Sequence, residues 1–173
     1  MPCPCPPLGA RVSRPPVGDR LQPPAPPSLG PMEDAEPRPV GRTKDVGWQI
    51  GVSRTLPVEL DRLWSFLTSA DGLSRWLGPG VEPPLAAGVR YRTSDGTTGE
   101  IRSFRPGDRL RLTWQPPDRP GPATVQFTVR PAATGTRLGF HTERLLSSDE
   151  REQMRLHWRR VIDEVERALV DGP

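Results

Sequence analysis

The chain contains only two histidines, and these are the first side chains to test for chemistry. His141 precedes Glu143 by two positions, a spacing that would put two potential metal ligands on one face of a strand. No third ligand is evident, and neither an H-E-x-x-H motif nor the P-C-x-x-C partner of a deaminase H-x-E occurs. We therefore predict no metal site. We expect His141 to face solvent, opposite its apolar neighbours Leu138 and Phe140.

Two other side chains are candidates for a general acid or base. His157 lies beside Trp158 at the edge of an apolar stripe, where it is either a cavity-lining base or, as we favour, a boundary histidine. Glu100 could be a buried anchor with a raised pKa, but Arg102 on the same strand face favours a solvated pair. No nucleophile elbow and no phosphate-binding loop occurs. We predict no catalytic residue and no cofactor, and we favour a protein that is not an enzyme, with an enzyme kept as an alternative.

Aromatic side chains give a stronger pattern than the titratable ones. Most of them fall on faces that we predict to point inward: Trp64, Trp76, Tyr91, Trp114, Phe127, Phe140 and Trp158. Such residues either pack as a core or form the wall of an amphipathic pocket, and the sequence leaves both interpretations open. Our candidates for lining a ligand cavity are Trp76, Tyr91, Trp114, Phe127, Phe140, Met154, His157 and Trp158.

These side chains need a sheet and helices to position them. Apolar residues alternate with polar or small ones in short runs, which predicts strands over 48–52, 89–93, 109–114, 125–129 and 137–142. We also predict a strand over 99–104. The sequence does not settle which of its faces points inward, because Ile101 and Phe104 have opposite parity. Helical spacing begins after Pro57 and again around Leu73, which predicts two short helices between the first and second strands.

A long helix closes the predicted domain. Ser147 and Glu150 have the spacing of a capping box at its start. One apolar stripe follows, formed by Met154, Trp158, Val161, Ile162, Val165 and Leu169. On the wet side we predict three ion pairs at i,i+4 spacing: Arg159–Asp163, Arg160–Glu164 and Asp163–Arg167. The order of elements indicates an α+β domain in which the helix packs on an antiparallel sheet.

The first 46 residues differ in composition from the rest. Of the 24 prolines, 13 precede Gly47, and this segment has no apolar periodicity. We predict a disordered tail over 1–46 and one folded domain over 47–170. Met32 is an alternative start of the protein. Cys3 and Cys5 both lie in the tail, so we expect no disulfide in the domain and a cytoplasmic protein.

Composition also excludes several classes of partner. No apolar stretch is long enough for a membrane span or a signal peptide, so we predict no membrane insertion. The net charge is only +3, and the basic residues form no concentrated patch in the sequence, so we expect no nucleic acid partner.

The ordered set of motifs resembles START-like (SRPBCC) domains, and within them the branch named after the activator of the Hsp90 ATPase. The resemblance spans about 47–170 and rests on 58–68, 73–77, 99–100, 110–114, 135–138 and His157–Trp158, where relatives often carry Gly-Trp. It implies a helix-grip (START-like or Bet v 1-like) fold, a curved antiparallel sheet of about six strands wrapped around the long C-terminal helix. A cavity often lies between the two.

This resemblance says less about function, because one fold hosts many activities. Our first hypothesis is a non-catalytic module that binds a small apolar molecule between helix and sheet. The alternatives are a co-chaperone-like partner of an Hsp90-type ATPase, which rests on the family name, and a polyketide cyclase-like or hydrolase-like enzyme that uses His157 and Glu100.

Overall fold

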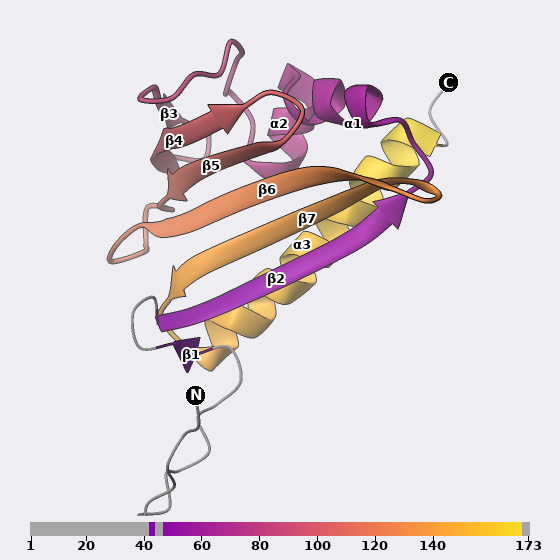
Figure 1. Ribbon diagram of the computed structural model, residues 1–173. Helices are drawn as coiled ribbons and strands as arrows, with labels where there is room; N and C mark the ends of the chain where they lie inside the picture. The colour runs from indigo at the N-terminus through magenta and orange to yellow at the C-terminus, as the bar shows by residue number, and fades with distance from the viewer. Residues whose placement is uncertain (1–41, 44–46, 171–173) are drawn as a thin grey trace, which may run out of the picture. The chain divides into compact units, whose positions relative to one another are not determined.

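One antiparallel sheet carries the fold of the described residues, which are 42–43 and 47–170 of the computed structural model. Its strands, in the order β1-β2-β7-β6-β5-β4-β3, are β1 (Arg42–Thr43), β2 (Gly47–Leu56), β7 (Gly135–Leu145), β6 (Ala123–Ala132), β5 (Arg109–Trp114), β4 (Thr98–Arg105) and β3 (Arg90–Arg92). The helices are α1 (Leu60–Leu67), α2 (Ala70–Trp76) and α3 (Ser148–Val170). The sheet curves, and all three helices lie on one side of it, with α3 running alongside β2 and β7 (Figure 1). The predicted helix-grip fold is confirmed.

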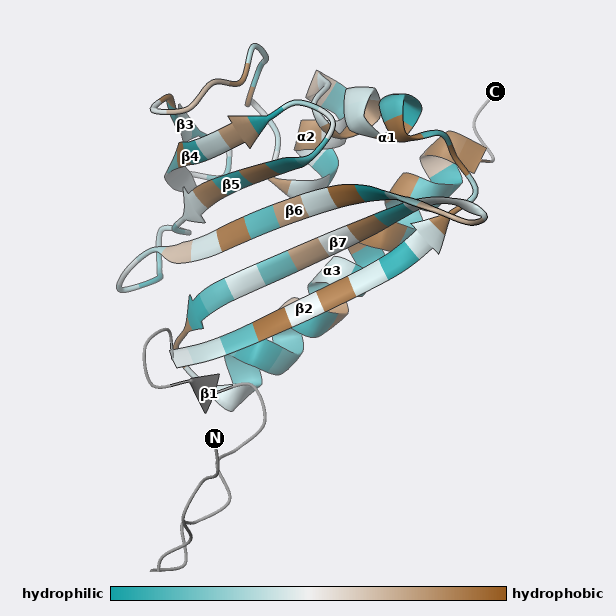
Figure 2. Cartoon of the chain, in the orientation of Figure 1, coloured by the Kyte–Doolittle hydropathy of each residue, from teal (hydrophilic) through white to brown (hydrophobic). Residues whose placement is uncertain are grey.

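Strict alternation explains why one face of the sheet is dry. Along β6, the side chains of Ala123, Val125, Phe127 and Val129 are buried, whereas the residues between them are partly exposed. Apolar and polar bands alternate along β5 and β6 in the same way (Figure 2). The helices cover the apolar face, and the predicted stripe of α3 is buried from Met154 to Leu169. Each element therefore buries the face that its periodicity predicted.

Two β-bulges adjust the facing of the strands. On β4 the register shifts between Ile101 and Ser103, so that Arg102 is the extra residue. Ile101 and Phe104 consequently both pack with the core despite their opposite parity. On β7 the register shifts beside Arg144, whose φ of 62° is unusual for a residue other than glycine. The second bulge turns Leu145 inward just before α3 begins.

The structure differs from the sequence predictions along α3 and at the start of the sheet. The i,i+4 ion pairs predicted along α3 were wrong. The Asp163 carboxylate pairs with Arg54 of β2 at 2.5 Å, and no ion pair joins Arg160 to Glu164 among the described residues. The two residues of β1, which we had assigned to the tail, pair with the start of β2. The rest of the tail, including Cys3, Cys5 and Met32, lies outside the described residues. None of the helices described is long and apolar enough to cross a membrane.

Candidate functional site

The inner face of the sheet brings the candidate aromatic residues together in rows. Strand pairing aligns neighbouring side chains across β5, β6, β7 and β2, because residues paired in an antiparallel sheet point to the same side. The rows are Leu110–Phe127–Phe140–Val52, then Leu112–Val125–Thr142–Ile50, and finally Trp114–Ala123 at the end of β5. The candidates on these strands thus share one face, as the sequence indicated.

Rings from the sheet and the helices form a continuous chain through the core. Trp76 of α2 contacts Phe127 edge-on, with ring centroids 5.2 Å apart, and lies 6.1 Å from Phe140. Phe140 in turn stacks on Trp158 of α3, with centroids 4.4 Å apart and an interplanar angle of 3°. Phe127 and Phe140 are at most 1% exposed. These four candidates fill the deep part of the grip as packed core.

Thr142 fixes the orientation of Trp158. The indole Nε1 of Trp158 donates a hydrogen bond to the Thr142 hydroxyl oxygen at 2.8 Å, and both side chains are buried. This bond satisfies the one polar atom of the indole. Sequence reasoning did not single out Thr142, although a threonine at an inward-facing position between apolar residues was a signal for such a partner.

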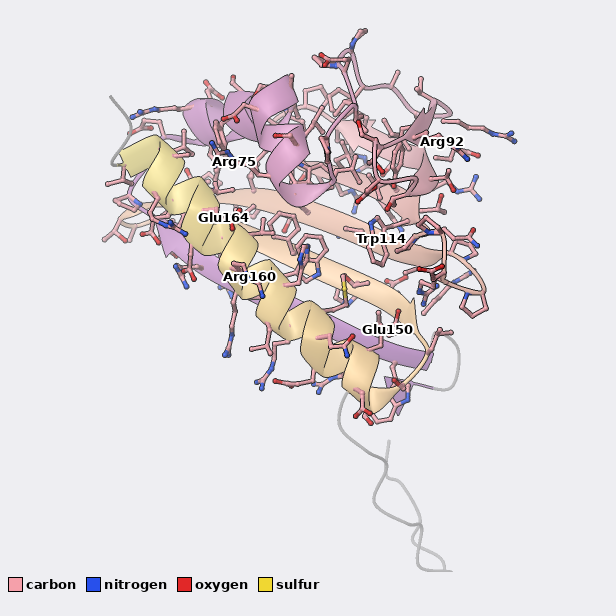
Figure 3. The ribbon with its side chains drawn as sticks, turned by 180° about the vertical axis from the view of Figure 1, so that it is seen from behind. Arg75, Arg92, Trp114, Glu150, Arg160 and Glu164 are labelled. Carbon is pink, nitrogen blue, oxygen red and sulfur yellow. The ribbon has the colours of Figure 1, made fainter. Side chains whose placement is uncertain are left out.

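The grip reaches the surface at one end, near Trp114 and the first half of α3. Because Leu145 leads directly into α3, the N-terminal turns of the helix lie at the Trp114–Ala123 end of the sheet. Trp114 and His157 are both partly exposed, whereas the side chain of Met154, one helical turn before Trp158, is only 7% exposed. Viewed from the helix side, Trp114 lies on β5 across from α3 (Figure 3). Trp114 and His157 thus lie at the boundary between core and solvent, and Met154 lies just inside it.

A buried ion pair fastens this end of the grip. Arg119, in the loop between β5 and β6, is 6% exposed and donates from Nε to Glu150 of α3 at 2.8 Å. It also donates to the carbonyl oxygens of Gly121 and Arg144. Glu150 lies in the predicted capping box, since its N–H donates to the Ser147 hydroxyl. Nothing in the Pro-rich sequence of the loop indicated this role for Arg119.

His157 is held in an environment that favours its neutral form. Its ring meets Trp158 edge-on, with centroids 4.6 Å apart. Burial lowers the pKa of His157 below its ordinary value of 6.5, the nearby Arg160 lowers it further, and Glu164 partly opposes them. The neutral imidazole presents one donor and one acceptor at the edge of the apolar stripe.

Tyr91 takes a position apart from the other candidates. Its hydroxyl donates to the carbonyl oxygen of Thr113 at 2.7 Å, and burial raises the pKa of this phenol well above its usual range. Together with Val81, Leu85 and Ile101 it lines an open hollow of about 220 Å³ beside the loop before β3. Tyr91 therefore belongs to a different surface from Trp114 and Met154.

The remaining titratable candidates contact neighbouring polar or charged side chains at the protein surface. Glu100 accepts from Arg102 at 2.7 Å, so the interpretation of a solvated pair is confirmed. His141 is 37% exposed on the outer face, as expected, with its Nδ1 3.5 Å from Glu143, which also pairs with Arg111. Within the described part of the chain, no group of three or more His, Cys, Asp or Glu is arranged to hold a metal ion.

A curved antiparallel sheet that grips a long C-terminal helix defines the START-like, or SRPBCC, class of proteins. Residues 57–169 match the family model described as activator of Hsp90 ATPase homolog 1-like protein. The chain belongs to this family. No curated protein matches the chain.

Solved structures agree with this fold at low sequence identity. DynU16, from the dynemicin biosynthetic locus, is 22% identical with a TM-score of 0.64, and the match covers 72% of this chain but only 48% of DynU16. CalU16 from Micromonospora echinospora is 21% identical with a TM-score of 0.62, covering 73% of this chain and 78% of that one. An Aha1 dimer from Colwellia psychrerythraea is 16% identical with a TM-score of 0.59, covering 72% and 97%.

Proposed function

We propose that this protein is a non-catalytic carrier or sensor in the cytoplasm that binds a small apolar molecule at the open end of its grip. The observation that carries the proposal is the position of Trp114, Met154 and His157. They join a continuous apolar face to the surface at the Trp114–Ala123 end of the sheet. Exposed aromatic area next to apolar area suits a ligand with an apolar body.

The packing of the deeper rings limits where such a ligand would lie. Phe140 and Trp158 stack closely, and Trp76 fills the space beside Phe127, so a ligand reaching that depth would have to displace core rings. We therefore place the ligand nearer the surface, beside the partly exposed Trp114.

The polar groups at this end favour binding over turnover. His157 is the titratable candidate at the boundary, and no second acid or base accompanies it among the candidates. Glu100 pairs with Arg102, and His141 lies on the outer face of the sheet. A neutral imidazole orients a polar end of the ligand through one hydrogen bond.

The first experiment identifies what co-purifies with the protein. Native mass spectrometry of the purified full chain, followed by organic extraction, should reveal a bound apolar compound. An Hsp90-type ATPase recovered in a pulldown, with no small molecule bound, would favour instead the co-chaperone function that the family name suggests.

Substitution at Met154 tests the location of the site. Met154→Trp should maintain or raise the melting temperature, because the larger ring finds room at the open end, while binding of an apolar dye should fall. Val165→Trp is the matched control, since Val165 is fully buried on the same stripe and overpacking there typically costs about 1–3 kcal/mol. Equal destabilisation by both changes, with no dye binding by the wild type, would contradict the proposal.

A further inference from the structure

The outer edge of β2 is open along most of its length among the described residues. Among the described residues, β1 pairs with β2 only at Gly47 and Trp48, so the strand has no outer neighbour from Ile50 to Leu56. An unpaired edge presents alternate N–H and C=O groups that can bind another extended chain. Its position beside α3 gives this edge a second wall (Figure 1).

Between the β2 edge and α3 lies an open groove of about 390 Å³. Its strand side is lined by residues 50–54, and its helix side by Arg151, Arg155, Arg159 and Ile162. These arginines are spaced four residues apart and therefore follow one face of the helix. Groove and arginines together form what we call the basic groove.

The spacing of the arginines matches an extended chain. Four residues of an α-helix rise about 6 Å. Alternate residues of a β-strand, which point to the same side, lie about 6.7 Å apart. A strand added to the edge of β2 would therefore place every second side chain opposite successive arginines of α3. Carboxylates at alternate positions fit this arrangement, because arginine pairs with them bidentately.

The existing partners of the arginines leave them able to bind carboxylates. Arg151 donates from Nε to the carbonyl oxygen of Gln49 at 3.0 Å. Arg155 pairs with Glu152 at 2.6 Å, but both side chains are well exposed, and such pairs contribute little. Arg159 is exposed. Two further acidic side chains, Asp163 and Glu166, lie one and about two turns beyond Arg159 and already hold Arg54.

We propose that the basic groove binds an acidic, extended segment of a partner protein, which adds as a strand to the free edge of β2. Its acidic residues alternate with others and face Arg151, Arg155 and Arg159. Charge argues against a second copy of the chain as the occupant. Two β2 edges paired about a two-fold axis would bring both arginine rows to the same side, facing each other. This inference is independent of the ligand site near Trp114.

The test uses the full-length protein and labelled peptides roughly eight residues long, about the length of the free edge. A peptide of alternating Glu and Val should bind about tenfold or more tightly than a peptide of the same composition in which the Glu residues form one block. Fluorescence anisotropy measures both affinities. Methylating the backbone nitrogens of alternate residues gives two further peptides of unchanged charge. Only the one whose methyl groups face β2 should lose binding.

Charge reversal on the helix tests the other wall. Arg155→Glu with Arg159→Glu should weaken binding of the alternating peptide about tenfold or more. Arg160→Glu with Arg167→Glu is the matched control, with the same charge change on α3 away from the groove, and should keep binding within about twofold. Backbone amide shifts in the wild-type protein should concentrate between Ile50 and Leu56.

Three results would overturn the proposal. If the alternating and the clustered Glu peptides bound equally well, or if both double arginine variants lost the same affinity, the binding would be general charge attraction. Indifference to both N-methylated peptides would exclude strand addition. No binding of the alternating peptide up to about 1 mM would mean that the arginines only guard the strand edge against association.

Discussion

Gly99 shows how a single missing side chain brings three strands together. A Cβ at this position would lie 1.9 Å from the carbonyl oxygen of Thr113 and 2.5 Å from the hydroxyl of Tyr91. The tyrosine bridges from β3 to β5 across this glycine, because its hydroxyl bonds to the same carbonyl. The space over Gly99 is therefore part of the contact between these strands.

Gly99→Ala should destabilise the domain by about 3 kcal/mol, since the added methyl group clashes with both the backbone of β5 and the ring of Tyr91. Gly121→Ala is the control, because a Cβ there meets nothing within 4 Å. Chemical denaturation should place this second variant within about 0.5 kcal/mol of the wild type. Similar losses in both variants would show that the close approach is not what matters.

His157 should make the stability of the protein depend on pH. Its pKa is lowered in the folded state, so below its ordinary value the unfolded chain binds more protons than the folded one. The stabilisation is complete above the unfolded pKa of 6.5 and is lost as the pH falls through the lower folded value. Denaturation of wild type and His157→Gln at about pH 7.5 and pH 5 should show the larger acid loss in the wild type. If wild type and His157→Gln lost the same stability at low pH, His157 would not be the cause of the pH dependence.

At the scale of elements, the Arg119–Glu150 pair joins a loop to a helix. Removing one partner of a buried ion pair leaves the other without compensation, which typically costs about 3–5 kcal/mol. Arg119 is 6% exposed and Glu150 20%. The start of α3 and the loop between β5 and β6 should therefore loosen together when the pair is broken.

Arg119→Ala should lower the free energy of unfolding by about 3 kcal/mol, and hydrogen exchange should speed up in the first turn of α3. Arg102→Ala removes an arginine from the exposed pair with Glu100 and should change stability by less than about 1 kcal/mol. If the two variants behave alike, the burial of Arg119 contributes nothing.

Periodicity predicted the elements well but could not predict the contacts between them. The inward faces of β5 and β6 and the apolar stripe of α3 follow from spacing alone, as the burial of Leu112, Val125 and Trp158 confirms. The bulge at Arg102 is a tertiary adjustment, which is why the sequence left the facing of Ile101 and Phe104 open. Likewise Asp163 pairs with a distant strand because α3 lies against β2, a fact that no helical spacing contains.

At the scale of the whole molecule, the predicted site separates into two parts. Trp76, Phe127, Phe140, Met154 and Trp158 pack as core, while Trp114 and His157 are partly exposed where that core meets solvent. Alternation shows which side chains point inward. How far each of them lies from solvent depends on where α3 begins relative to β5. The Arg119–Glu150 pair fixes that relation, and it joins residues 31 positions apart.

The residues before the first strand should contribute little to the stability of the fold. The first strand of the sheet begins at Arg42, and of the 24 prolines 13 precede it, in a segment without apolar periodicity. Such a composition offers little apolar surface to bury. Removing residues 1–41 should therefore leave the melting temperature within about 2 °C of the full chain. Calorimetry on both proteins gives the comparison. A loss of several degrees, which for a domain of this size corresponds to about 1 kcal/mol, would mean that the first 41 residues stabilise the sheet.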